Sequence, residues 1–366
     1  MPCEIRSPAK YVQGEGVIDS IDEYIDPLGE SAWLLSDELV FDIVGEQIDT
    51  ALDAAHIPLD TSTFRGECTE SEVSRHVADV SDGSTVIIGA GGGKTLDTAK
   101  AVSIETELPM ISVPTIASTD APASSLSVFY TQEGEFDYIR VHPRHPDVVL
   151  VDTRIIAQSP VRFFQSGIAD AIATWYEADT AYRANAQNVF GAQSTRAARA
   201  IARECFEIID KHGTSAINAV KQDSVTPAVE HVTEANVLLS GIGFESGGLA
   251  AAHAVHDGLT TIETSHEATH GEKVNIGTLT QLVLEGAEMN EIETFLERSI
   301  ELGLPIHLGE IGLGSLDENQ FKRISEAACA PEETIHNEPF PVEPPQVRDA
   351  LRTADRLGRN ARERSQ

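Results

Sequence analysis

The chain has 366 residues and a formal net charge of −33 at pH 7, because 59 Asp and Glu residues stand against only 26 Lys and Arg. Its length and its 41% hydrophobic content are sufficient for two packed domains, each with its own core. The acidic surplus excludes nucleic acid as a partner, because phosphate binding depends on clustered Lys and Arg. No apolar stretch approaches the roughly 20 residues that a membrane helix needs, and the first residues lack the apolar middle of a secretory signal. We therefore expect a cytoplasmic protein with no membrane partner.

The acidic residues are spread along the whole chain. Such a surface repels itself in dilute buffer, whereas at about 1 M salt the screening length falls to roughly 3 Å and most of the repulsion disappears. This pattern predicts a halophilic, salt-adapted protein. The four cysteines have no C-x-x-C spacing, so we expect free thiols rather than a zinc knuckle or a redox pair.

Up to about residue 160, short β-branched runs alternate with amphipathic stretches, which is typical of a parallel sheet covered by helices. The first predicted strand is followed by a helical pattern through Val40, Val44, Ile48 and Leu52. Strands are predicted at residues 31–36, 84–89, 109–114 and 148–151, and a hairpin at 126–131 and 136–142, on either side of Glu133-Gly134-Glu135.

After Ser159-Pro160, a predicted helix N-terminus, Ala-rich patterns of helical length dominate. We therefore predict an α/β fold with a parallel-sheet domain at residues 1–160 and an all-helical domain at residues 161–366. A proline-rich spacer at residues 339–345 precedes a last amphipathic helix, which we expect to pack within the chain or to pair with another subunit.

The segment TVIIGAGGGKTLDTAKA predicts a strand, a glycine loop and a helix in direct succession. Several backbone N–H groups and the helix N-terminus then converge on one point, which is an anion site suited to a pyrophosphate. Gly91, Gly92 and Gly93 allow the phosphate to approach the backbone closely, and Lys94 adds a positive charge beside it.

Two better-known motifs match this loop only in part. A nucleoside-triphosphate P-loop needs glycine at the position of Ile88, and the dinucleotide fingerprint needs a third glycine at the position of Lys94. A glycine-rich turn without any ligand remains the structural alternative.

Histidines form two clusters in the second half of the chain. His253 and His256 share a face of a helical pattern, where histidine is more often a hydrogen-bonded core residue than a ligand. His266 to His270 matches the H-E-x-x-H motif of zinc metallopeptidases, which is a competing interpretation. Gly271, directly after the motif, and the lack of a long apolar helix before it argue against a metallopeptidase.

Asp170 lies in the otherwise apolar helical run GIADAIATWYEA. A carboxylate in such a position costs several kcal/mol unless it is paired or bound to a metal. A buried ion pair with Arg or Lys and a metal site both remain open.

Taken together, these segments resemble the glycerol dehydrogenases, which belong to the iron-containing alcohol dehydrogenase superfamily and are related in fold to dehydroquinate synthase. The likeness runs through most of the chain and includes GGGKTLDTAKA, PTIASTDAPASSLSVFY, AAAHAVHDGLT and HGEKVNIGTL. It implies that the sheet domain binds NAD, that the helical domain binds the metal and the substrate, and that the active site lies in the cleft between them. The family's habit also implies a homo-oligomer.

The resemblance implies that Asp170, His253 and His270 bind one catalytic Zn²⁺ per subunit. In the iron-dependent relatives a further histidine follows the aspartate by four residues, and Thr174 at that position favours zinc over iron. Asp120 is implied to contact the substrate, and His256 to position the substrate or to relay a proton.

On the cofactor side, the resemblance assigns Asp37 to the adenosine ribose, where a carboxylate favours NAD over NADP. It places Gly93 and Lys94 at the pyrophosphate. The residues implied on the nicotinamide side are Thr115, Ser118, Ser124, Leu126 and Tyr130.

We therefore expect NAD-dependent oxidation of glycerol, or of a similar small vicinal diol, to dihydroxyacetone or the corresponding hydroxyketone, with zinc polarising the substrate oxygen. A glycerol-1-phosphate dehydrogenase of the same fold is the nearest alternative. The segment STDAP, at residues 118–122, argues against that alternative. We associate glycerol-1-phosphate dehydrogenases with a variant of this segment that carries glycine after the aspartate. A catalytically inactive NAD-binding protein is a third class, and the three competent metal positions argue against it.

Overall fold

The computed structural model describes residues 1–132, 134 and 136–365, and these form two compact units. The sheet unit comprises Ser7–Phe164 and Asn218–Gly241, and the helical unit comprises Met1–Arg6, Gln165–Ile217 and Ile242–Gln366. The predicted boundary near residue 160 lies close to the break after Phe164. Three further breaks, after residues 6, 217 and 241, arise because residues 1–6 group with the helical unit and residues 218–241 group with the sheet unit.

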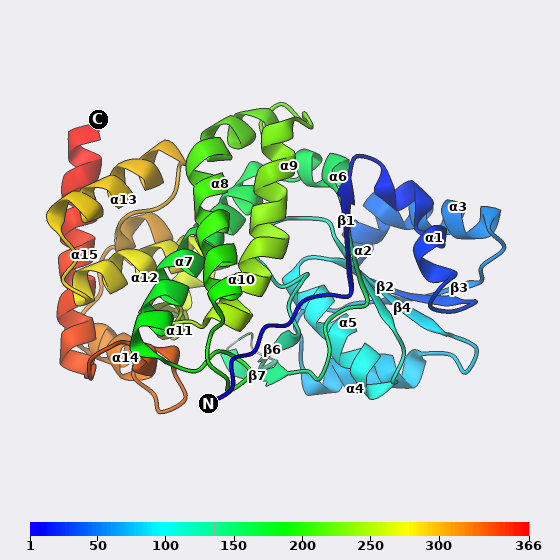
Figure 1. Cartoon of the computed structure of the whole chain (residues 1–366), viewed down its shortest axis with the longest axis horizontal. Helices are drawn as coiled ribbons and strands as arrows, with labels where there is room; N and C mark the ends of the chain where they lie inside the picture. Colours follow the sequence, from blue (N-terminus) through cyan, green and yellow to red (C-terminus); the bar gives the residue numbers. More distant parts are fainter. Residues whose placement is uncertain (133, 135, 366) are drawn as a thin grey trace. The chain divides into compact units, whose positions relative to one another are not determined.

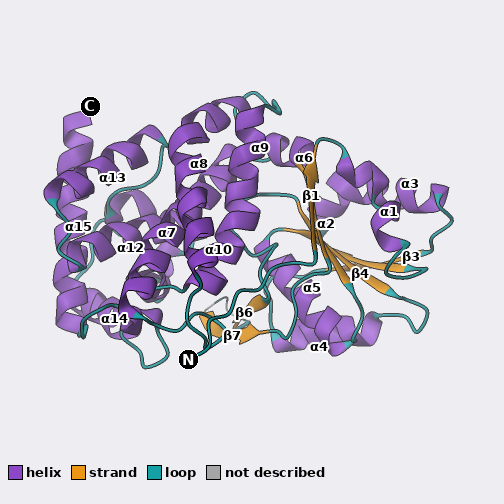
Figure 2. Cartoon of the chain, in the orientation of Figure 1, coloured by secondary structure: helices purple, strands orange, loops and turns teal. Residues whose placement is uncertain are grey.

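Six parallel strands form the sheet, in the order β1-β8-β5-β4-β2-β3. The strands are orange in Figure 2. The four inner strands are buried along their whole length, as their continuous hydrophobic runs predict. The strands are β1 (Lys10–Gly14), β2 (Ala32–Ser36), β3 (Leu59–Thr63), β4 (Val86–Gly91), β5 (Met110–Pro114) and β8 (Val148–Asp152).

Alternate residues of each strand point to opposite faces of the sheet. Both faces carry apolar side chains, and each is covered by helices. Leu34 and Ile88 belong to a core with the helical residues Val44 and Ile48 on one face. Trp33, with Ile87, belongs to a second core on the other face, together with α4 and α5. The helices of this unit are α1 (Asp22–Ile25), α2 (Glu38–Val40), α3 (Glu46–Ala54), α4 (Glu70–Asp79), α5 (Gly93–Glu105), α6 (Thr153–Gln158) and α9 (Pro227–Glu234).

The predicted hairpin is present as the antiparallel strands β6 (Leu126–Tyr130) and β7 (Phe136–Val141). Glu133 and Glu135, which belong to the predicted connection, lie outside the described residues. The edge strands β1 and β3 were not predicted. Both are partly exposed, and their sequences KYVQG and LDTST carry no hydrophobic run.

The helical unit contains the long helices that the sequence predicts (Figure 1). The last helix, α15, packs against α12 and α14 of its own chain. Close approach between helices depends on glycine, because a Cβ atom at Gly277 would lie 2.1 Å from the Ala252 oxygen. The helices are α7 (Val161–Ala184), α8 (Arg196–Val220), α10 (Ser240–Gly247), α11 (Ala251–Thr260), α12 (His270–Leu284), α13 (Met289–Glu301), α14 (Glu318–Ala328) and α15 (Pro344–Ser365).

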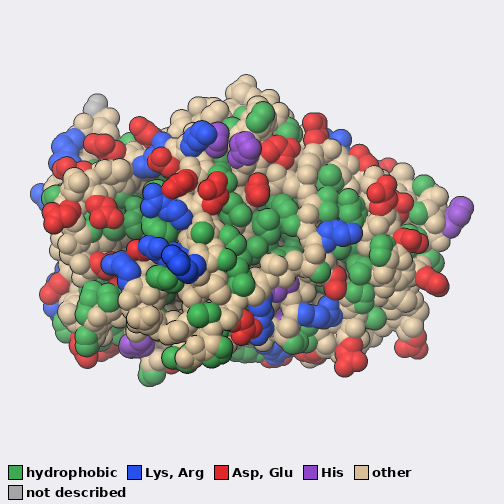
Figure 3. Space-filling model, viewed as in Figure 1, with side chains coloured by type: hydrophobic (Ala, Val, Ile, Leu, Met, Phe, Trp, Pro, Cys, Tyr) green, Lys and Arg blue, Asp and Glu red, His purple; other side chains and the backbone are tan. Residues whose placement is uncertain are grey.

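The surface carries the acidic excess that composition predicts. On the face shown in Figure 3, acidic side chains are scattered over the molecule rather than gathered in one patch. All four cysteines are free thiols. Among the described residues, no helix combines the length and the apolar character needed to cross a membrane.

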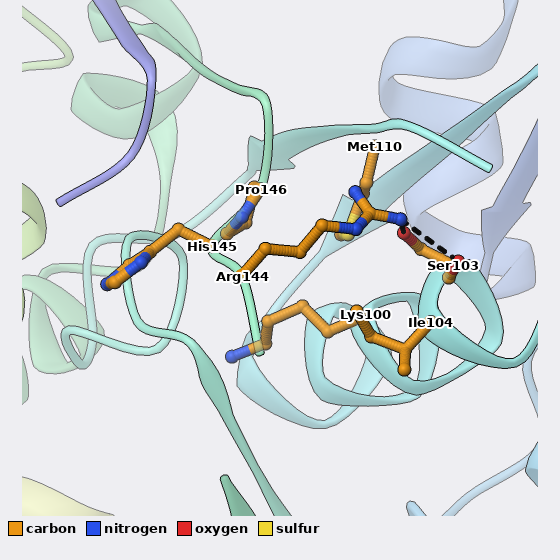
Figure 4. A pocket seen from close by; sticks show the side chains of 7 residues that line it. All are labelled: Lys100, Ser103, Ile104, Met110, Arg144, His145 and Pro146. Carbon is orange, nitrogen blue, oxygen red and sulfur yellow. Dashed lines mark hydrogen bonds between the residues drawn. The ribbon is translucent and has the colours of Figure 1, made fainter. Parts of the chain in front are cut away.

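A small hollow beside α5 and β5 is lined by Lys100, Ser103, Ile104, Met110, Arg144, His145 and Pro146 (Figure 4). The Arg144 guanidinium extends across it and donates to the Ser103 and Leu108 carbonyl oxygens at 3.1 and 2.6 Å. The Lys100 ammonium donates to Ala121 O at 2.9 Å. Because both cations already donate to the protein's own oxygens, we assign no ligand to this hollow.

Candidate metal centre and nucleotide-binding loop

Three side chains from three helices of the helical unit meet at one point. Asp170 lies on α7, His253 on α11, and His270 is the first residue of α12, and one potential ligand atom of each lies within 4.8 Å of the other two. The Asp170 Oδ1 atom is 3.3 Å from His253 Nε2 and 3.2 Å from His270 Nε2. Two imidazole nitrogens and one carboxylate form a donor set that catalytic zinc uses, with a further position open.

The hydrogen bonding of Asp170 fits a bound cation. Its side chain is 1% exposed, and within the described part of the chain its Oδ2 atom has no hydrogen-bond partner. Burial raises the pKa of this carboxyl, but His270 and His253 outweigh burial and hold the pKa below its usual value. Its ion-pair partners among the described residues are these two histidines. The Arg or Lys pairing that the sequence left open is therefore wrong.

Glycine and a helix cap place His270 beside Asp170. Thr269 and Glu272 form a capping box at the start of α12. The Gly271 N–H donates to Ser166 Oγ at 3.0 Å, and a Cβ atom at Gly271 would lie 1.8 Å from the Ser166 backbone oxygen. Only glycine therefore permits this approach of α12 to α7.

The H-E-x-x-H segment does not form the helix that a metallopeptidase needs. His266 lies in the turn before α12 and is exposed, and its Nε2 atom is 3.0 Å from the Thr260 carbonyl oxygen. His266 and His270 therefore do not share a helical face, and the metallopeptidase interpretation is wrong.

His256 lies beside the three candidate ligands. Its ring centroid is 4.3 Å from that of His270, and its Nδ1 atom is 2.8 Å from Asp257 Oδ1. Burial, together with His270 and Lys273, holds the pKa of His256 well below its usual range. Thr174, where iron-dependent relatives carry histidine, is buried, and its hydroxyl donates to the Asp170 carbonyl oxygen at 3.3 Å.

Sequence reasoning missed Glu177, two helical turns after Asp170 on α7. This side chain is fully buried, and its Oε2 atom lies 2.5 Å from His253 Nδ1. The signal was present in GIADAIATWYEA, where a second carboxylate follows Asp170 in an apolar helix.

The glycine loop forms the predicted transition from strand to helix. Strand β4 ends at Gly91, whose φ of 151° favours glycine, and α5 begins after Gly92 without a side-chain cap. Asp37 lies at the end of the neighbouring parallel strand β2, where its Oδ1 atom accepts the Val40 N–H at 2.8 Å. The loop and Asp37 therefore lie at the same edge of the sheet, where open α/β sheets bind nucleotides.

Two predicted cofactor residues lie together near this loop. The Lys94 ammonium is 5.1 Å from the centre of the Tyr130 ring. It also forms an ion pair with Glu67 Oε1 at 2.5 Å. Glu67 is a partner of Lys94 that the sequence did not indicate.

The segment from Thr115 to Leu126 is anchored to α5 by a buried ion pair. Lys100 lies 2.8 Å from Asp97, and its ammonium also donates to Ser124 Oγ at 3.0 Å and to the Leu126 carbonyl oxygen. Thr115 and Ser124 are buried, and Ser118 is partly buried.

The predicted substrate contact, Asp120, lies in this anchored segment. Its Oδ2 atom accepts the Ser240 hydroxyl at 2.8 Å. The anchoring residues Asp97 and Lys100 were not predicted, because their roles depend on contacts about 20 to 30 residues away.

A family profile described as iron-containing alcohol dehydrogenase matches residues 8–153. The chain is 50% identical to a glycolaldehyde reductase of Halobacterium salinarum over 100% of both chains. It is 46% identical to a glycerol dehydrogenase of Thermotoga maritima over 96% of both. The solved structure of glycerol dehydrogenase from Schizosaccharomyces pombe matches with a TM-score of 0.97 at 38% identity, covering 99% of this chain and 93% of that one.

The chain therefore belongs to the iron-containing alcohol dehydrogenase family. Within that family, its relatives include glycerol dehydrogenases of bacteria and of a yeast, at 39–46% identity over nearly the whole chain. The predicted fold class, a parallel-sheet part followed by an all-helical part, is confirmed.

Proposed function

We propose that this protein is an NAD-dependent polyol dehydrogenase that oxidises glycerol, or a similar small vicinal diol, to dihydroxyacetone or the corresponding hydroxyketone. The observation that carries the proposal is the cluster of Asp170, His253 and His270, in which a buried carboxylate oxygen has no hydrogen-bond partner among the described residues. The likeness to glycerol dehydrogenases along the whole chain supports it.

The proposal assigns NAD to the sheet unit and the divalent metal to the helical unit. When bound, a divalent ion polarises a substrate hydroxyl and NAD accepts the hydride, so these groups supply the Lewis acid and the redox chemistry. Asp170, His253 and His270 would hold the ion. We infer zinc rather than iron, because Thr174 offers a hydroxyl at the position where the iron-dependent relatives carry a third imidazole.

The remaining site residues bind and orient the reactants. The N–H groups of Gly92, Gly93 and Lys94 lie at the uncapped start of α5 and would bind the pyrophosphate. Asp37 accepts hydrogen bonds from the adenosine ribose and repels a 2′-phosphate, which favours NAD over NADP. Thr115, Ser118, Ser124, Leu126 and Tyr130 line the nicotinamide side.

Two further residues serve the substrate. Asp120 accepts a hydrogen bond from a polyol hydroxyl, and His256 orients the substrate or relays a proton. A cytoplasmic location and a homo-oligomer stay predictions, and light scattering of the purified protein at high salt tests the second.

Glycolaldehyde reduction is a second candidate function, because the relative at 50% identity carries that name. This reaction would use the same site for reduction instead of oxidation, and its substrate carbonyl belongs to an aldehyde instead of a ketone. The two functions differ in the substrate that gives the higher kcat/KM.

A substrate panel in molar salt tests the proposal. It compares glycerol, propane-1,2-diol and glycerol-1-phosphate with NAD, and dihydroxyacetone and glycolaldehyde with NADH, before and after chelation and after return of zinc or iron. We expect polyol activity that chelation abolishes and zinc restores, and loss of activity in His270→Ala. Activity that survives chelation or His270→Ala contradicts the metal assignment, and a preference for glycerol-1-phosphate contradicts the substrate.

A further inference from the structure

The carboxylate of Glu177 contacts both the ring and the backbone of a candidate metal ligand. Its Oε2 atom lies 2.5 Å from His253 Nδ1, and its Oε1 atom accepts the backbone N–H of His253 at 3.0 Å. Glu177 is 0% exposed. Burying a carboxylate is costly unless it is hydrogen-bonded, and these contacts supply the bonds.

The same carboxylate also caps the helix that carries His253. Helix α11 begins after Ala250, which offers no side-chain cap. Glu177 Oε1 accepts the Ala250 N–H at 3.0 Å, and Gln281 Oε1 accepts the Ala252 N–H at 2.9 Å. The first turn of α11 is therefore held by side chains from α7 and α12, and Glu177 satisfies two of its N–H groups.

These contacts determine which nitrogen of His253 faces the other ligands. An ionised carboxylate only accepts hydrogen bonds, so His253 Nδ1 must carry the proton that it donates to Glu177. The lone pair of the neutral ring is then on Nε2, which is the atom 3.3 Å from Asp170 Oδ1. A carboxylate on the far nitrogen of a histidine ligand fixes the orientation of the ring and increases its basicity.

We propose that Glu177 is a positioning residue of the metal centre. Glu177 holds His253 with Nε2 toward the ion and fixes the start of α11, the helix that carries His253. This inference rests on the proposed metal-dependent function. It assigns Glu177 no contact with substrate or cofactor.

Glu177→Gln tests this inference with little change of shape. The amide oxygen still accepts the two backbone N–H groups, but the amide NH₂ now donates to Nδ1 and moves the ring proton to Nε2. We expect the dissociation constant for zinc to increase ~10–100-fold, measured by competition with a chromophoric chelator on protein stripped of metal and reloaded. This readout does not depend on catalytic activity.

Gln281→Met is the matched control. It removes the hydrogen bond to Ala252 N–H at the same end of α11, and the donations of the Gln281 amide to Tyr176 O, Thr180 Oγ1 and Glu285 Oε1, without touching the ring of His253. We expect a lower melting temperature but zinc affinity within about threefold of the unchanged protein, a range that corresponds to ~0.7 kcal/mol. The inference holds only if Glu177→Gln weakens zinc binding more than this control does.

An NMR measurement covers the case in which Glu177→Gln does not fold. In the zinc-loaded unchanged protein, ¹⁵N-labelled His253 should carry its proton on Nδ1, and zinc on Nδ1 instead would overturn the inference. A Glu177→Gln protein that binds zinc as tightly as Gln281→Met overturns it as well. If the unchanged protein binds zinc no better than His270→Ala does, the proposed function itself fails.

Discussion

At the scale of single residues, the proposed chemistry depends on a buried carboxylate that the described residues satisfy only in part. Asp170 Oδ2 is buried without a partner among the described residues, and two imidazole nitrogens face the other oxygen of the same carboxylate. Leaving such a group unsatisfied costs ~1–3 kcal/mol, so a bound cation stabilises the folded state as well as completing the site.

Asp170→Asn should therefore remove the metal without removing the fold. The neutral amide keeps the shape of the carboxylate but no longer offers an anionic oxygen, and we expect the zinc content at micromolar free zinc to fall from about one ion per chain to below ~0.1. Metal analysis after gel filtration measures this content. Thr174→Ser is the control, because it keeps the buried hydroxyl, and full zinc content in Asp170→Asn contradicts the assignment of this ligand.

Glu338 should make stability fall as the pH rises. Burial, followed by the charges of Glu285 and Glu177, raises the pKa of this carboxyl to about 8 in the folded protein, against about 4.3 in an unfolded chain. Between these two values the folded protein binds more protons, so the contribution of Glu338 to stability is fully present below about pH 4 and is lost as the pH rises through 8.

Glu338→Gln removes this loss. We expect the variant to melt ~3–6 °C above the unchanged protein at pH 9, with the difference narrowing toward pH 5, when both are measured by calorimetry at fixed salt. An equal melting difference at both pH values would show that Glu338 does not titrate in this way.

At the scale of elements, the candidate metal centre requires three helices to approach one another closely. Gly271 lets α12 begin against the backbone of α7, and Gly277 lets the same helix pass the backbone of α11. The ligands come from these three helices, so the geometry of the site depends on the spacing of the helices as much as on the ligands themselves.

Gly271→Ala should therefore disturb both stability and metal binding. Its Cβ atom would lie 1.8 Å from the Ser166 oxygen, which forces α12 away from α7. We expect a loss of ~2–3 kcal/mol in the free energy of unfolding and at least ~10-fold weaker zinc binding, measured by denaturant titration and chelator competition. Gly83→Ala, whose Cβ would meet no atom within 4 Å, is the control and should change neither value.

In the sheet unit, the ion pair of Asp97 and Lys100 anchors the segment that carries Asp120. Lys100→Met leaves Asp97 buried without its cation, and we expect a destabilisation of ~3–5 kcal/mol and a higher KM for NAD and for the polyol. Lys322→Met, on an exposed helical face, should leave both KM values unchanged. Unchanged stability in Lys100→Met contradicts the anchoring role.

At the scale of the whole molecule, the net charge of −33 decides the solvent in which the fold is stable. Repulsion between acidic groups extends over about 30 Å at 0.01 M salt, whereas at 1 M salt it is screened within about 3 Å. The likeness to a Halobacterium salinarum protein is consistent with such an environment.

Salt should therefore raise stability over a wide range of concentration. We expect the melting temperature to rise by ~10 °C between 0.1 and 2 M KCl, and catalytic activity to be retained longer at the higher concentration. Sucrose at matched viscosity is the control. A melting temperature that does not change with salt contradicts the prediction of salt adaptation.

Sequence by itself determined the inner strands, the glycine loop, the long helices and the kinds of residue at the candidate metal centre. Buried strands and amphipathic helices leave a local pattern of apolar residues, and a glycine loop between a strand and a helix is a local motif. The resemblance to a family then selected Asp170, His253 and His270 from all the polar residues of the chain.

Only the tertiary structure decided which polar groups meet. Glu177 with His253, and Lys100 with Leu126, are pairs whose members lie far apart in sequence, so no local pattern marks them. The edge strands β1 and β3 were missed for a related reason, because half-exposed strands need no apolar run and are defined by their neighbours in the sheet. Local periodicity records burial, whereas the partner of a buried polar group depends on how distant segments pack.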